Sequence, residues 1–253
     1  MTSQIPNRLI AKLEVKNGYV VKGLMMEGVQ RVGDPIAYAK RYYNEGADEL
    51  ILLDIVASLY QRVELPTIIS SILKDTFLPI CAGGGICSIK DAELLFRAGA
   101  DKICVNTSAV QRPDFLGELV NRFGSQSIVS QIDVKFYHDQ YRVFTNSGRD
   151  LSDYNLLNWL AIVQEQRVGE ILLTSIDNDG IKRGLDLALA KLARSNCEVP
   201  LVFGGGVSSL SDIAAAYDEN CDGCAVASAF HFEDLKITEV KNDLMSKDIM
   251  MRV

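Results

Sequence analysis

The sequence lacks the features of a membrane or secreted protein. No apolar run reaches the roughly 18 residues that a membrane-spanning helix needs, and the first residues, MTSQIPNRLIAKLEV, contain no apolar core of a signal peptide. Positive charge is also scarce, because 26 Lys and Arg against 33 Asp and Glu give a net charge of −7. Nucleic-acid-binding domains usually present a basic face. We therefore expect a cytoplasmic protein without a membrane or nucleic-acid partner.

Several catalytic and cofactor motifs are missing as well. The sequence contains no P-loop, no dinucleotide-binding glycine fingerprint and no Ser–His–Asp arrangement. Most of its six cysteines lie in or beside apolar runs, where buried free thiols are common. Cys221 and Cys224 have the C-x-x-C spacing of redox or zinc sites, but no second pair of Cys or His lies near them. We expect free thiols, no metal site and no cofactor.

The chain does contain a regular alternation of apolar runs and helical patterns. Runs rich in Val, Ile and Leu, without polar alternation, are typical of parallel strands covered on both faces; they lie at 9–15, 49–54, 78–82, 102–106, 127–133, 170–174, 200–203 and 223–227. Helical patterns lie between them at 35–45, 63–74, 88–98, 112–123, 153–166, 187–195 and 209–218. Eight strands alternating with helices in 253 residues predict a single-domain (β/α)8 barrel, with a doubly wound open sheet as the alternative.

An internal repeat strengthens the barrel prediction. Gly83 and Gly204, which each open a GGG triplet, are 121 positions apart. The same offset relates the pairs Glu49 with Glu170 and Asp101 with Asp222. One offset held across three separate units indicates duplication rather than a chance likeness of βα units. We expect two half-barrels, at about 1–123 and 124–253.

The GGG triplets follow the third strand of each predicted half. Active sites of barrels lie at the carboxyl ends of the strands, where glycines allow backbone N–H groups to approach a ligand. The helix N-terminus that follows would add partial positive charge. Each fourth strand is followed by a small polar residue, Thr107 or Ser228. Two equivalent anion sites at one mouth predict a substrate with two phosphates.

Two carboxylates occupy corresponding places in the halves. Glu14 in RLIAKLEVK and Asp133 in SIVSQIDVKF each follow an apolar run, precede Val-Lys and lie 119 positions apart. Placing a carboxylate at the end of a barrel strand costs desolvation, so we expect both to act in general acid–base catalysis. The alternative is a structural ion pair of one of them with Lys12, Lys16 or Lys135.

A long segment at 16–34 follows the first strand and contains four glycines and Lys22. Such long loops are often lids, and Lys22 is expected either to grip a phosphate or to be a solvated surface lysine. Asp179 and Gly180 predict a tight turn that could also touch phosphate. A hairpin insertion is expected around His138, which is given no role.

The chain resembles the cyclase subunits of imidazole glycerol phosphate synthase, the HisF family, over nearly its whole length. The matching segments are VVKG, GDP, DELILLDI, GGGI, GADKICVNTSAV, FGSQSIV, IDVK, GEILLTSIDNDG and SAFHF. The resemblance implies a duplicated (β/α)8 barrel and a lyase that joins ammonia to the bis-phosphorylated ribonucleotide PRFAR, giving imidazole glycerol phosphate and AICAR. It also implies phosphate binding by Gly85, Asn106, Thr107, Asp179, Gly180, Gly206 and Ser228.

The resemblance further implies a partner protein. In the family, a glutaminase subunit (HisH-like) docks at the N-terminal face of the barrel in a heterodimer and supplies the ammonia. A ring of charged residues guards that entrance, and the matching positions here are Arg8, Glu49, Lys102 and Glu170. A structural salt-bridge ring would have the same sequence. Asp101 matches a residue that communicates with the glutaminase.

One departure leaves other functions open. The family's first strand resembles Cys-Leu-Asp-Val-Lys, whereas this chain has Lys-Leu-Glu-Val-Lys from Lys12 to Lys16. Glutamate keeps the carboxyl chemistry, but its extra methylene moves the carboxyl group by about 1 Å, which can cost on the order of 100-fold in rate. The alternatives are a HisF-like paralogue that delivers ammonia for amidino-sugar formation in lipopolysaccharide synthesis, a non-catalytic glutaminase activator, and the related isomerase of the histidine pathway.

Overall fold

The centre of the protein is a closed ring of eight parallel strands. The computed structural model describes residues 6–57 and 64–252. The ring strands, in their order around it, are β1 (Arg8–Lys16), β4 (Glu49–Asp54), β5 (Ile80–Gly83), β6 (Lys102–Val105), β7 (Ile128–Tyr137), β10 (Glu170–Ser175), β11 (Leu201–Gly204) and β12 (Gly223–Val226). Pairing of β12 with β1 closes the sheet. The predicted (β/α)8 barrel is confirmed, and the open-sheet alternative is wrong.

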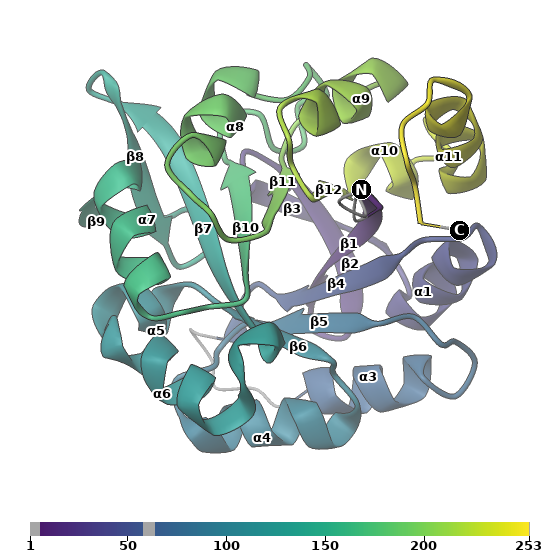
Figure 1. The fold of residues 1–253 in the computed structure, drawn as a ribbon. Coiled ribbons are helices and arrows are strands. Elements are labelled where there is room, and N and C mark those ends of the chain that lie inside the picture. The colour runs from purple at the N-terminus through teal and green to yellow at the C-terminus, as the bar shows by residue number, and fades with distance from the viewer. Residues whose placement is uncertain (1–5, 58–63, 253) are drawn as a thin grey trace, which may run out of the picture.

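Helices connect the strands and cover the outside of the ring (Figure 1). The predicted helices are found within three residues of their expected bounds: α1 (Pro35–Asn44), α3 (Leu65–Ile72), α4 (Ile89–Ala98), α6 (Asp114–Phe123), α7 (Leu156–Glu165), α8 (Leu187–Arg194) and α9 (Leu210–Asp218). The sequence did not predict α5 (Thr107–Gln111), η1 (Ser125–Ser127), α10 (Ser228–His231) or α11 (Ile237–Ser246). Among the described helices, none combines the length and apolarity of a membrane span.

Two antiparallel hairpins extend from the ring. Strands β2 (Tyr19–Leu24) and β3 (Glu27–Gly33) follow β1, while β8 (Gln140–Thr145) and β9 (Asp150–Asn155) follow β7. The expected long loop over 16–34 is wrong, because most of this segment pairs as a hairpin. The expected hairpin at His138 is confirmed. Hairpins at equivalent places favour the division into two half-barrels, which stays a prediction.

The hydrophobic core has an inner and an outer part. Alternation along the strands directs successive side chains to opposite faces. Inside the ring, Ile10, Ile51, Cys104 and Leu172 belong to a buried cluster. Between ring and helices, a larger cluster includes Trp159, which is fully buried. The packed interior separates the two ends of the barrel, so polar side chains gather at its ends rather than at its middle.

Candidate active site

The two predicted acids lie on opposite strands of the ring and share one cavity. β1 carries Glu14 and β7 carries Asp133, and both carboxyl groups line a central cavity of about 330 Å³ of empty space. Each acid has a donor two residues earlier on the same strand, Lys12 or Gln131, which lines the same cavity. Residues two apart on a strand share a face, so both pairs lie inside the barrel.

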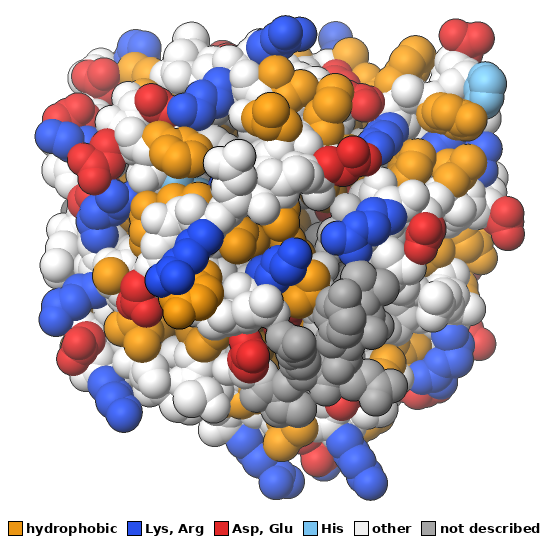
Figure 2. All heavy atoms as spheres, turned by 180° about the vertical axis from the view of Figure 1, so that it is seen from behind, with side chains coloured by type: hydrophobic (Ala, Val, Ile, Leu, Met, Phe, Trp, Pro, Cys, Tyr) orange, Lys and Arg blue, Asp and Glu red, His pale blue; other side chains and the backbone are white. Residues whose placement is uncertain are grey.

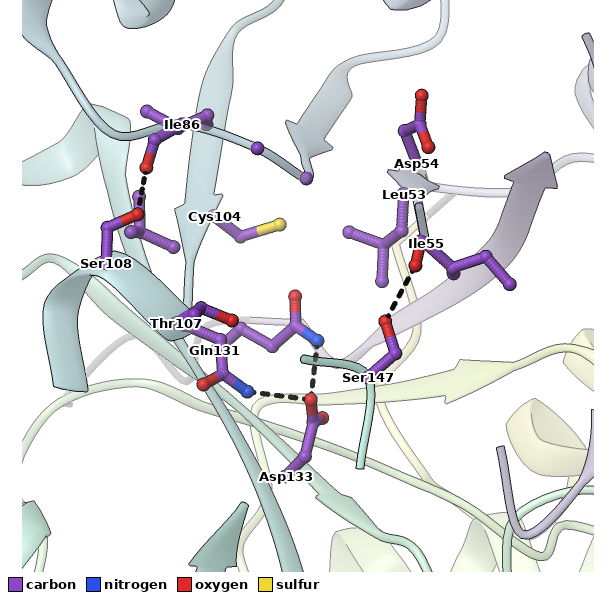
Figure 3. Close-up of a pocket in the computed structure, with 14 residues that line it drawn as sticks. Leu53, Asp54, Ile55, Ile86, Cys104, Thr107, Ser108, Gln131, Asp133 and Ser147 are labelled. Carbon is purple, nitrogen blue, oxygen red and sulfur yellow. Dashed lines mark hydrogen bonds between the residues drawn. The ribbon is translucent and has the colours of Figure 1, made fainter. Parts of the chain in front are cut away.

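Asp133 is a fully buried carboxyl group held by neutral donors. Its Oδ2 accepts a hydrogen bond from Asn106 Nδ2 at 2.7 Å. It also accepts one from Gln131 Nε2 at 2.9 Å (Figure 3). Its Oδ1 is buried and has no hydrogen-bond partner among the described residues. Burial raises the pKa of Asp133 to about 6, although Lys12 and the two amides favour the ionised form. A carboxyl group with this pKa can gain or lose a proton near neutral pH.

Glu14 is instead held by two ammonium groups. Lys12 Nζ lies 2.9 Å from Oε1, and Lys22 Nζ lies 2.9 Å from Oε2. Burial alone would raise the pKa of Glu14, but the two lysines outweigh it and hold the pKa well below its usual range. The structural ion pair considered from sequence therefore exists for Glu14. Its catalytic role stays a prediction.

A cavity lined by residues of the predicted first half, the first-half cavity, lies beside Asp133. It encloses about 520 Å³ of empty space, part of it open to solvent, and the predicted residues Gly85, Asn106 and Thr107 line it. The Thr107 hydroxyl accepts a hydrogen bond from the backbone N–H of Asn146, in the β8–β9 turn, at 3.0 Å. Ser147 in the same turn donates to Ile55 O across the mouth at 3.1 Å (Figure 3). The second hairpin thus forms part of the cavity wall.

A second-half cavity occupies the equivalent place on the other side. It has about 300 Å³ of empty space and brings together Asp179, Gly180, Gly206 and Ser228, all predicted for phosphate binding. Lys12 and Lys182 add positive charge to its lining.

On the side of the molecule turned away in Figure 1, several Lys and Arg side chains lie near the middle of the surface (Figure 2). The negative net charge of the chain therefore does not exclude local positive charge.

The repeated glycines are required by close backbone approach. A Cβ on Gly84 would lie 2.1 Å from Asp54 O, and one on Gly205 would lie 2.4 Å from Ser175 O. Both glycines have positive φ, 108° and 96°. Real Cβ atoms do not approach oxygen so closely, so a side chain at either place would displace the neighbouring strand end.

The helices that follow these turns are capped by their own side chains. Ser88 and Asp91 form a capping box at α4, as Ser209 and Asp212 do at α9. Asp91 accepts from the backbone N–H of Cys87 and Ser88. The N–H groups of Cys87, Ser88 and Asp91 are therefore engaged within the turn. The expected contribution of the helix N-terminus to an anion site stays a prediction.

Lys22 lies on strand β2 rather than in a loop. Its side chain is buried, and Nζ donates to Asp179 Oδ2 at 2.6 Å as well as to Glu14. The expectation of a solvated surface lysine is therefore wrong. The turn after β2 reaches the mouth, because Met25 N donates to Asp179 O at 2.8 Å and Met26 lines the central cavity. A Cβ on Gly148 would lie 3.2 Å from Met26 Sδ, so the turns of the two hairpins meet above this cavity.

At the opposite end of the barrel, the four predicted ring residues form a closed salt-bridge circuit. Arg8 lies 2.8 Å from both Glu49 and Glu170, and Lys102 lies 2.9 and 3.2 Å from the same two carboxylates. Burial and the nearby Glu170 raise the pKa of Glu49. Burial lowers the pKa of Lys102, but the two glutamates outweigh it and raise it. The ring lies at the starts of four strands, at the N-terminal end of the barrel.

Asp101 lies beside this ring but has a structural contact of its own. Its Oδ2 accepts a hydrogen bond from the backbone N–H of Ile80 at 2.8 Å. Asp222 makes the same contact with Leu201 N, also at 2.8 Å. Each aspartate thereby satisfies the first N–H of a neighbouring strand. The predicted role of Asp101 in communication with a partner stays a prediction.

Comparisons with known proteins agree with this geometry. The family model described as "Histidine biosynthesis protein" matches residues 8–236. The chain belongs to this family. The imidazole glycerol phosphate synthase subunit HisF of Helicobacter hepaticus is 40% identical over 250 residues, which are 98% of this chain and 99% of that protein. The HisF subunit of Dehalococcoides mccartyi (strain CBDB1) is 40% identical, over 97% of this chain and 98% of that protein. The HisF subunit of Natranaerobius thermophilus is 38% identical, over 98% of this chain and 100% of that protein.

The six cysteines are free thiols. Cys221 and Cys224 are buried free thiols, and burial raises the pKa of Cys221 to about 12. No group of three metal-ligating side chains occurs among the residues that the structure describes. The other histidine of the chain, His231, lies outside the hairpin and is buried, with Nδ1 2.6 Å from Tyr42 OH.

The sequence analysis did not identify Gln131 as a site residue, and it considered Lys12 only as an ion-pair partner. Both line the central cavity and contact an acid. A signal for them exists, because Lys12 and Gln131 are 119 positions apart, as Glu14 and Asp133 are. The Ser147 side chain in the β8–β9 turn was also missed, since no local motif indicates that this turn crosses the mouth.

Proposed function

We propose that this protein is the cyclase subunit of an imidazole glycerol phosphate synthase, a lyase of histidine biosynthesis. In the reaction, ammonia is joined to PRFAR, and cyclisation and cleavage give imidazole glycerol phosphate and AICAR. The relatives reported above carry this synthase name, which favours histidine biosynthesis over ammonia delivery for a polysaccharide. The fold with its two repeated cavities supports the proposal independently of the names.

The observation that carries the proposal is that Asp133 lines both the central cavity and the first-half cavity. Gly85, Asn106 and Thr107 would bind one phosphate of the substrate, and Asp179, Gly180, Gly206 and Ser228 the other. The ribonucleotide would then span the central cavity with its reacting atoms near Asp133. The carboxyl group, with its pKa of about 6 and its unpaired Oδ1, would transfer protons during ring closure.

The ammonia would come from a glutaminase subunit at the other end of the barrel. The relatives are named as subunits, which implies a partner. The ring of Arg8, Glu49, Lys102 and Glu170 would be the gate through which ammonia enters, and Asp101 beside it would face the glutaminase. Ion pairs with side-chain exposures between 4% and 20% would keep this entrance closed until the partner acts on them.

The test is turnover of PRFAR by the purified chain with high ammonium at alkaline pH. We expect turnover by the unaltered chain and by Asp139→Asn, which changes an exposed aspartate in the β7–β8 turn. Asp133→Asn should abolish it, because an amide cannot transfer the proton. Absence of turnover in the unaltered chain, with a glutaminase still bound tightly, would overturn the proposal and leave a non-catalytic activator or an ammonia-delivering subunit.

A further inference from the structure

The two halves of the barrel carry different charges at equivalent places. In the second half, Gln131 Nε2 donates to Asp133 Oδ2 at 2.9 Å. In the first half, Lys12 Nζ contacts Glu14 Oε1 at the same distance. Both donors lie two residues before their acid, and both pairs are related by the offset of 119. A neutral amide in one half therefore corresponds to an ammonium group in the other.

Each donor also lies between the central cavity and one of the outer cavities. Gln131 lines the central and the first-half cavity. Lys12 lines the central and the second-half cavity, where Gly206 and Ser228 lie. The lining of the first-half cavity contains no Lys or Arg among the described residues, whereas that of the second contains Lys12 and Lys182. The two cavities thus differ in their attraction for an anion.

The ammonium group of Lys12 is buried and still able to bind a ligand. The residue is 3% exposed, and its Nζ contacts one carboxylate oxygen of Glu14 at 2.9 Å. An ammonium group has three N–H donors, so two remain for a ligand in the cavity. Glu14, in contrast, has both oxygens engaged by lysines.

We propose that the Lys12 ammonium, for which Glu14 is a competing partner, contacts a phosphate group in the second-half cavity. The inference rests on the proposed function for the nature of its ligand, a phosphate monoester of the substrate. An ammonium–phosphate contact is a charge-assisted hydrogen bond and is stronger than a neutral one. The second-half cavity therefore binds phosphate more tightly than the first, and the substrate is held mainly at that end.

The test is a titration of the full chain with inorganic phosphate, followed through the backbone amide NMR signals. Gly206 and Ser228 report on the second-half cavity, and Gly85 and Thr107 on the first. The variant Lys12→Gln copies the arrangement of the other half, and Lys247→Gln removes an exposed lysine as control. We expect Lys12→Gln to weaken phosphate binding at Gly206 and Ser228 by about 10-fold or more, and to leave the first-half signals and the control unchanged. Equal weakening of both cavities, or none, would overturn the inference.

A second variant keeps the inference testable should Lys12→Gln not fold. Glu14→Gln removes the carboxylate that competes with phosphate for the ammonium group, so phosphate binding should become tighter at Gly206 and Ser228 alone. Unchanged or weaker binding there would contradict the inference. Turnover of PRFAR separates the two proposals: Lys12→Gln should raise KM more than it lowers kcat. If the unaltered chain has no turnover, the proposed function fails, while the phosphate titration still decides the role of Lys12.

Discussion

The side-chain amide of Asn106 donates to Asp133 Oδ2 over 2.7 Å, so a residue predicted to bind phosphate also holds the proposed catalytic carboxyl group. The same Nδ2 donates to Phe144 O at 3.2 Å, which fixes the amide orientation from β8. Its own Oδ1 has no partner among the described residues. Asn106 therefore links the first-half cavity to the acid–base group.

Removal of this amide should change the proton affinity of Asp133. A hydrogen bond to the ionised carboxylate favours that form, and Asn106 lowers the pKa of Asp133 in this way. In Asn106→Ala the pKa should therefore rise above about 6. The check is a carbon-13 NMR titration of the Asp133 carboxyl group, with Asn158→Ala on the exposed face of α7 as control. A pKa that stays or falls in Asn106→Ala would contradict the assignment of this contact.

The raised pKa of Asp133 also predicts how stability depends on pH. Because the folded pKa, about 6, lies above the ordinary value of about 3.9, folding is favoured by protonation below pH 4, and this contribution is lost as the pH rises through 6. Asp133→Asn removes the cost of ionising a buried carboxyl group. The free energy of unfolding of Asp133→Asn minus that of the unaltered chain should therefore increase by about 2 kcal/mol from pH 4 to pH 8.

Urea unfolding at both pH values measures this difference. Asp139→Asn is the control, since its side chain is exposed and should give the same difference at both pH values. A gain for Asp133→Asn that is equal at pH 4 and pH 8 would show that the carboxyl group is not the cause. A loss at pH 8 would show that the ionised form is stabilised by its surroundings.

Sequence alone predicted the elements that follow from local patterns. The strand at 49–54 was predicted to the residue, because a short apolar run bounded by polar residues is typical of a parallel strand covered on both faces. β9 was missed, since residues 150–155, DLSDYN, contain little apolar sequence and their strand conformation depends on pairing with β8. Such pairing is a property of the tertiary structure and not of the segment.

The sequence predicted that the two acids face one cavity but did not predict their electrostatics. Glu14 and Asp133 line one cavity, as the sequence analysis expected, but that analysis gave the two acids the same role. The structure distinguishes them because Lys22 reaches Glu14 from β2, a strand that the sequence interpretation took for a loop. Burial of Lys12 between two cavities likewise depends on ring closure. The ring residues were expected from the resemblance to the HisF family, and in the structure each of them opens a strand.

The repeated glycines should be indispensable for folding and not only for ligand binding. Gly84→Ala and Gly205→Ala would each place a Cβ within 2.4 Å of a backbone oxygen at positive φ. We expect each to lower the free energy of unfolding by about 2–4 kcal/mol, from overpacking and backbone strain together. Gly28→Ala separates the two causes, because Gly28 also has positive φ but no atom within 4 Å of the added Cβ. It should cost only about 1 kcal/mol, measured by urea unfolding, and equal losses at all three glycines would contradict the close-approach argument.

Asp101 and Asp222 offer a matched pair for testing the predicted partner contact. Both accept a hydrogen bond from a strand N–H at 2.8 Å, at equivalent places in the two halves. Asparagine keeps an oxygen that can accept this bond, so Asp101→Asn and Asp222→Asn should each change the free energy of unfolding by about 1 kcal/mol or less. If Asp101 faces the glutaminase as predicted, Asp101→Asn alone should lower the glutamine-dependent turnover several-fold, because it removes a charge at the interface. Turnover with added ammonium should stay unchanged in both variants, since the proposed active site lies at the other end of the barrel. An equal loss of glutamine-dependent turnover in both variants would assign the effect to the strand ends, and no loss in either would remove Asp101 from the interface.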